Sequence, residues 1–203
     1  MGAPPEPPGA AGVRLPSGGF RVEALVLVPG ASALASALLA PLFAAAASRA
    51  GLAPVCLGLA WAYGLASGVL SVWAVRASRA RAPGLAAALS SLGGAWGFYL
   101  SLAGWAGICA AGAPEGGLRE AFALAAQGAL RLGRDPAGLA RIALGGSCSP
   151  WIFMGIEIRG HAALAALALE WLAFTAGIWL PARRLASRPY SEGAGVWLSR
   201  ARP

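Results

Sequence analysis

Lysine is absent from the chain, and all 16 of its basic side chains are arginines. Charge of either sign is scarce: charged residues make up 12% of the 203 residues, about half the share in soluble globular domains. Hydrophobic residues make up 58%, and the mean hydropathy is positive. This composition argues against an ordinary soluble domain and favours an integral membrane protein.

Residues that usually carry chemistry are also few. His161 is the single histidine, and Cys56, Cys109 and Cys148 show no metal-ligand spacing. The sequence has no nucleotide-binding loop, no Gly-x-Ser-x-Gly turn and no pair of acids at catalytic spacing. The arginines are scattered without a basic face, which argues against nucleic acid as a partner. We therefore predict a non-enzymatic protein with no cofactor, no metal and no catalytic residue.

Long charge-free runs predict four membrane spans. Residues 24–48 and 50–75 contain no charged side chain, and a third such run extends to residue 114. A run of about 24 helical residues covers about 36 Å, enough to cross a hydrocarbon core of about 30 Å. The predicted spans are 24–47, 53–75, 85–108 and 161–180, and the predicted fold class is an all-α membrane bundle.

The segments between and around the spans have distinct compositions. "SRAGLAP", residues 48–54, has Gly51 to cap one helix and Pro54 to begin the next, so the first two spans should be antiparallel neighbours. The Pro/Gly-rich residues 1–23 predict a flexible tail, and residues 182–203 a basic one.

The loop 109–160 predicts an amphipathic interfacial helix followed by a short second helix. Asp135 would cap the second helix and Pro136 would begin it. The charge-free residues 142–156 are too short to span and are interpreted as interfacial or re-entrant. The apolar side chains that share one face of the first helix at helical spacing are Leu118, Phe122, Ala125, Ala129 and Leu132.

Arginine counts predict the orientation. With the N-terminus inside, ten arginines fall on the cytoplasmic side and six on the other. The positive-inside rule then favours a multi-pass protein of a bacterial inner membrane with both termini in the cytoplasm. All three cysteines fall towards the outer side, where a disulfide involving Cys148 and a role as small apolar fillers both remain open.

Glu170 interrupts the apolar run "ALALEWLAFTAGIWL", residues 166–180, and is predicted to lie near the bilayer midplane. No Arg or His falls at a matching depth in the other spans, so desolvation favours the protonated carboxyl group. Ser67 on the second span and Trp96 or Tyr99 on the third are its expected partners. Glu170, Tyr99 and Ser67 therefore form the candidate intramembrane polar site.

Two functions are compatible with this site. In the first, Glu170 ties helices together by a hydrogen bond in a binding or scaffold component. In the second, a small transporter or channel uses Glu170 to handle a proton or cation. The expected partners are the lipid bilayer and a second copy or another membrane protein.

Small residues recur at intervals of three and four in the second and third spans. Such ridges allow helix backbones to approach closely in lipid. They predict an internal seam of one bundle, with homodimer formation as the alternative. The ridge residues are Gly64, Ser67, Gly68, Ser71, Gly93, Gly97 and Ser101.

Three stretches stand out together: the helix pair at residues 61–105, "ALEWLAF" at 168–174 and "RPYSEGAGVW" at 188–197. In these stretches the chain resembles a family of uncharacterised bacterial multi-pass membrane proteins. In that family an aromatic-Cys-Glu-x-Cys element followed by Trp stands at the last place. Here Tyr190, Glu192 and Trp197 fit, but Ser191 and Ala194 replace the two cysteines. The resemblance implies a membrane architecture without a metal or redox role for that element, and it implies no reaction.

Overall fold

The structure is a computed structural model of the chain. The structure describes residues 13–14, 21–50, 52–80, 82–112, 117–144, 152–153, 156–158, 161–187, 190–191 and 196–197.

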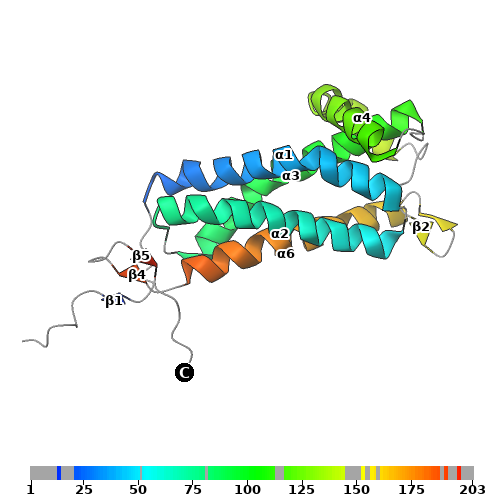
Figure 1. Ribbon diagram of the computed structural model, residues 1–203. Coiled ribbons are helices and arrows are strands. Elements are labelled where there is room, and N and C mark those ends of the chain that lie inside the picture. The colour runs from blue at the N-terminus through cyan, green and yellow to red at the C-terminus, as the bar shows by residue number, and fades with distance from the viewer. Residues whose placement is uncertain are drawn as a thin grey trace, which may run out of the picture.

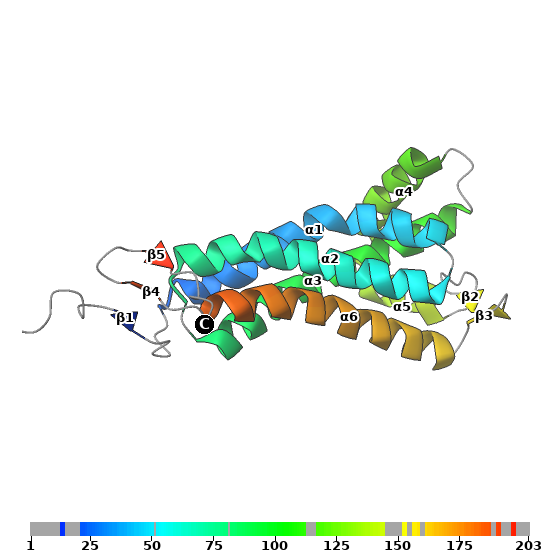
Figure 2. The same cartoon turned by 60° about the horizontal axis from the view of Figure 1, so that its bottom comes forward.

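The described residues form six helices, four of which are long and apolar enough to cross a membrane. The four long helices lie side by side along one axis (Figures 1 and 2), so the predicted all-α bundle is confirmed. Apolar runs of this length form helices because in lipid every backbone N–H and C=O needs a hydrogen-bond partner within the segment. The helices are α1 (Ala24–Ala50), α2 (Ala53–Ala77), α3 (Pro83–Ala111), α4 (Gly117–Leu132), α5 (Pro136–Leu144) and α6 (His161–Ala186).

The described residues also include five strands of two residues each, which lie at the two ends of the bundle (Figure 1). A three-stranded sheet in the order β1-β4-β5 marks what we name the tail end, and the β2–β3 pair lies at the other, the α4 end. Most of the predicted tails 1–23 and 182–203, and of the stretch 142–156, lies outside the described residues. The strands are β1 (Val13–Arg14), β2 (Ile152–Phe153), β3 (Ile156–Glu157), β4 (Tyr190–Ser191) and β5 (Val196–Trp197).

The sequence predicts that the last span ends at residue 180. In the structure its helix, α6, continues through Pro181 to Ala186. A proline inside a helix removes one backbone hydrogen bond, which argues for a helix end. Leu185 and Ala186 are nevertheless buried, in one cluster with residues of α1, α2 and α3. Packing of this last turn therefore outweighs the lost hydrogen bond.

The four long helices pack in the order α1, α3, α6, α2 around the bundle, each against two neighbours. The confirmed antiparallel hairpin of α1 and α2 is held by the Tyr63 hydroxyl, which donates to the Ser36 carbonyl at 2.7 Å. The two closest pairs, α1 with α3 and α2 with α6, are parallel and not consecutive in sequence. The beginning of α1 and the end of α6 therefore lie at the same end of the bundle (Figure 2).

Glycines allow both parallel pairs to approach at backbone distance. A Cβ atom at Gly64 would clash with the Phe174 carbonyl oxygen of α6, and one at Gly93 with the Pro29 carbonyl oxygen of α1. All seven residues of the predicted small-residue ridges are buried inside the single chain. The ridges are therefore an internal seam, as predicted.

A serine-rich contact adds one hydrogen bond between α1 and α3 and one within α1. The Ser32 hydroxyl donates to the Ser90 carbonyl at 2.6 Å, and the Ser36 hydroxyl donates to the Ser32 carbonyl at 2.6 Å. Both donors are fully buried. In the membrane, such a bond between helices stabilises by about 0.6 kcal/mol on average.

The amphipathic helix α4 packs on the bundle through its small residues. Its buried residues are Ala121, Ala125 and Gly128, whereas Leu118 is 54% exposed and Phe122 is 42% exposed. The cause is a close backbone contact, because a Cβ at Gly128 would meet the Cα of Gly107 on α3. Only a face of small side chains permits that approach, so Leu118 and Phe122 point outward, whereas Leu124 and Leu132 are partly buried beside it.

Candidate functional site

Glu170 points into the bundle because it shares a helical face with the buried residues Phe174, Gly177 and Ile178. These positions recur at intervals of three and four, which places them on one side of α6. Phe174 and Ile178 are fully buried, and Glu170 is 5% exposed. The packing of this face fixes the direction of the glutamate side chain.

Glu170 lines a small cavity between α1, α3 and α6. The cavity has a volume of about 20 Å³, and a single water molecule needs about 10 to 15 Å³ measured in this way. Its polar neighbour Ser101 donates its hydroxyl proton to the Phe98 carbonyl at 2.6 Å. The lining residues are Phe43, Ala44, Ala47, Ser101, Leu102, Trp105 and Glu170.

Cys56 is a second polarisable group at this site. Its thiol is fully buried and free, and its sulfur lies 3.9 Å from the Ala47 carbonyl oxygen. Glu170 is near enough to interact electrostatically with it. The site thus joins all four long helices: Glu170 from α6, Cys56 from α2, Ala47 from α1 and Ser101 from α3.

The site lies on the α4 side of the middle of the bundle. Ala44 and Ala47 of the cavity wall stand about 5 to 9 Å along the helix axis from the end of α1 at Ala50. Measured along α6, Glu170 lies about 20 Å from Arg183 near the tail end. Along α6, Glu170 lies about 5 Å from the middle of the helix, on the side of the α4 end. Its depth in a membrane stays a prediction.

The structure does not bring Ser67 to Glu170. Gly64 lies opposite Phe174 and Gly68 opposite Ile178, which sets Ser67 about two helical turns from Glu170 towards the tail end. The Ser67 hydroxyl oxygen is buried without a hydrogen-bond partner in the described part of the chain.

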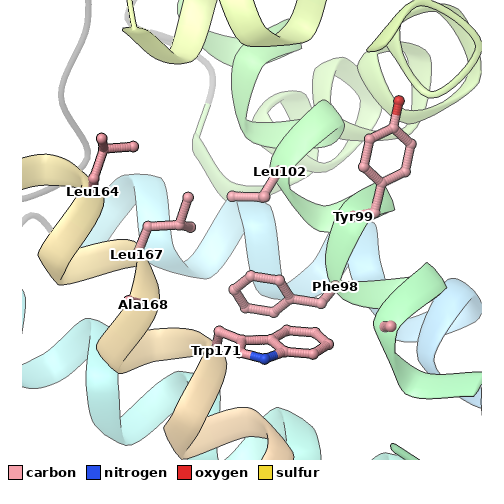
Figure 3. Close-up of a pocket in the computed structure, with 8 residues that line it drawn as sticks. Phe98, Tyr99, Leu102, Leu164, Leu167, Ala168 and Trp171 are labelled. Carbon is pink, nitrogen blue, oxygen red and sulfur yellow. The ribbon is translucent and has the colours of Figure 1, made fainter. Parts of the chain in front are cut away.

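Tyr99 lies on the outer side of α3, where it stacks on Trp96 with ring centroids 5.6 Å apart. It lines an open groove of about 380 Å³ between α3 and α6, together with Phe98 and Trp171. In Figure 3 its ring points away from the α6 side chains Leu167 and Trp171. The expected trio of Glu170, Tyr99 and Ser67 is therefore spread over three places in the bundle.

Sequence reasoning missed Cys56, Trp105 and Ser101 as neighbours of Glu170. One signal was available for Cys56. In an antiparallel hairpin, residues at equal distances from the connecting loop are level, and Cys56 and Ala47 flank the loop at 51–52 nearly symmetrically. No comparable signal locates Trp105, because its depth depends on how far α3 is shifted along α1.

The cysteines now divide into two kinds. Cys109, near the end of α3, is disulfide-bonded, whereas Cys56 is free. Cys148, for which a disulfide and a role as a small apolar filler both stay open, lies outside the described residues. Within the part of the chain that the structure describes, no three His, Cys, Asp or Glu residues lie together as a metal site would need.

Residues 190–197, which carry part of the family resemblance, are described at 190–191 and 196–197. Tyr190 in β4 is the cross-strand partner of Trp197 in β5, so the two aromatic residues of the resemblance stand opposite each other. Glu192 and Ala194 lie outside the described residues, and the family resemblance stays a prediction. Comparison with known protein families, with curated proteins and with solved structures finds no match.

Proposed function

We propose that the protein is a non-enzymatic scaffold component of a bacterial inner membrane, in which Glu170 helps to hold the helices in one arrangement. The observation that carries the proposal is the enclosure of Glu170. Its side chain is 5% exposed, and the cavity beside it, about 20 Å³, has room for one water molecule. A proton or cation pathway needs a series of polar groups, whereas a helix-joining carboxyl group needs only close neighbours.

Two observations support an orientation with both termini in the cytoplasm. Of the described arginines at the ends of the four long helices, five lie at the tail end and one, Arg49, at the α4 end, as the positive-inside rule expects if the tail end is cytoplasmic. The five are Arg21, Arg76, Arg79, Arg183 and Arg184. The disulfide-bonded Cys109 lies at the α4 end. Disulfides persist in oxidising compartments such as the periplasm.

Replacing Glu170 with Gln should leave the free energy of unfolding within about 0.5 kcal/mol of the wild type. The amide has the size of the protonated carboxyl group and can both donate and accept a hydrogen bond. Glu170→Ala should lower the free energy of unfolding by about 1 to 3 kcal/mol, because it enlarges the cavity and orphans polar neighbours. Unfolding in bicelles, followed by circular dichroism, measures both effects.

Leu169→Ala is the matched control, because this neighbouring side chain is 53% exposed on the outer face of α6. Proteoliposomes containing wild type or Glu170→Gln should show the same proton permeability. Crosslinked partners recovered from native membranes should be the same for these two proteins and reduced for Glu170→Ala. A proton flux in the wild type that Glu170→Gln abolishes would instead establish the transporter.

The orientation is testable with single cysteines at the two ends of the bundle. Arg21→Cys at the tail end and Arg119→Cys on α4 both replace exposed side chains. A membrane-impermeant maleimide should label the α4 variant in intact spheroplasts and the tail-end variant only after the membrane is opened. The wild type, whose free Cys56 is buried, gives the background. The reverse pattern would place the termini outside.

A further inference from the structure

The last turns of α3 and the helices α4 and α5 enclose a second pocket, of about 340 Å³. This volume is in the range of small-molecule sites. Its wall is mostly apolar, formed by Ala110, Leu124, Leu132 and Ile142, and it is completed by the polar side chains of Gln127 and Arg131. The pocket therefore combines an apolar interior with one cationic group.

Two more arginines are close in sequence to the lining residues of this pocket. Arg134 lies in the turn between α4 and α5, and Arg141 precedes the lining residue Ile142 on α5. Both guanidinium groups are exposed, as is that of Arg131. The one acidic side chain among residues 131–144, Asp135, accepts a hydrogen bond from the Gly138 amide at 2.9 Å. An anion at the pocket would thus meet net positive charge.

The position of α4 places the pocket near a membrane surface. Gly107 on α3, which contacts Gly128 on α4, lies about 6 Å along the helix axis from the end of α3 at Ala111. Large apolar side chains of α4, including Phe122 and Leu130, remain exposed at 42% and 68%. An amphipathic helix at this depth lies at the boundary between headgroups and acyl chains.

We propose that this pocket binds an anionic phospholipid of the leaflet at the α4 end. The phosphate group binds the Arg131 guanidinium, whose paired N–H donors match phosphate oxygens. The first part of an acyl chain packs against Leu124, Leu132 and Ile142. The occupant is a lipid and not free phosphate, because most of the pocket wall is apolar and gives a free anion no hydrogen bonds. The proposal is independent of the role of Glu170.

The test counts the lipids that the full-length protein retains. The protein is taken from nanodiscs of equal phosphatidylglycerol and phosphatidylcholine and measured by native mass spectrometry. The wild type should retain phosphatidylglycerol selectively, and Arg131→Gln should lower that retention about fivefold, the effect of one interfacial arginine. Arg119→Gln is the matched control, since this exposed arginine lies near the other end of α4 and does not line the pocket.

A second variant tests the apolar part of the pocket with every arginine in place. Ala111, an exposed lining residue at the end of α3, is replaced by Trp to fill the pocket mouth. Retention of phosphatidylglycerol should fall here too, and added inorganic phosphate should not displace the lipid from the wild type. Equal retention by Arg131→Gln and Arg119→Gln, equal retention of the two lipids by the wild type, or no effect of Ala111→Trp would each overturn the proposal.

Discussion

Replacing Gly64 with Ala should lower the free energy of unfolding by about 3 kcal/mol, the upper end of the usual cost of overpacking. The new Cβ would fall on the carbonyl group of Phe174, which belongs to the α6 backbone and cannot rotate away. Helices α2 and α6 must therefore separate, and the contact of Gly177 with the backbone of α2 is lost with it. Unfolding in bicelles, followed by circular dichroism, measures the loss.

Gly58→Ala provides a control on the same helix. A Cβ at Gly58 would meet no atom within 4 Å, and alanine favours a helix over glycine by about 1 kcal/mol. This variant should be as stable as the wild type or more so. If Gly64→Ala is no less stable than Gly58→Ala, then α2 and α6 do not pack at backbone distance.

Replacing Phe174 with Ala should also lower the free energy of unfolding by about 3 kcal/mol. Phe174 is fully buried, and its ring centroid lies 4.7 Å from that of Tyr63, 5.3 Å from that of Phe98 and 6.0 Å from that of Trp171. Because lipid is as apolar as the side chain, the loss comes mainly from dispersion contacts and the cavity left behind. Bicelle unfolding again measures it.

Leu172→Ala is the control, because it removes an apolar side chain that is exposed and not buried. Leu172 is two residues before Phe174 on α6 and is 62% exposed. Its loss should change the free energy of unfolding by less than about 0.5 kcal/mol. Similar costs for Phe174→Ala and Leu172→Ala would mean that the aromatic cluster does not stabilise the bundle.

Much of the fold was predictable because it follows from solvation. A run such as residues 24–48 has no charged side chain, and in lipid it can only form a helix that satisfies its own backbone. The beginnings of α2 and α5 were predictable from Pro54 and Pro136, which stand in their first turns. The ends were less so, because the extension of α6 past Pro181 depends on where Leu185 packs.

The candidate site was predictable in part. A glutamate in an apolar span attracts attention by composition alone, and Glu170 does face the interior of the bundle. Its neighbours depend on how far each helix is shifted along the others, which is set by close contacts such as Gly97 against Ser36. The orientation of α4 depends on close contacts in the same way. Helical periodicity identified the face with large apolar side chains, but the Gly107–Gly128 contact decides which face of α4 packs on the bundle.

The parallel pairing of α2 with α6 has a consequence during biosynthesis. The ribosome synthesises Gly64 and Gly68 roughly a hundred residues before Phe174 and Ile178, the residues that pack against them. At usual rates of translation, α2 waits roughly 5 to 20 s for its partner. Throughout that interval the nascent hairpin of α1 and α2 presents a groove of exposed glycine backbone to the insertion machinery and to any other helix in the membrane.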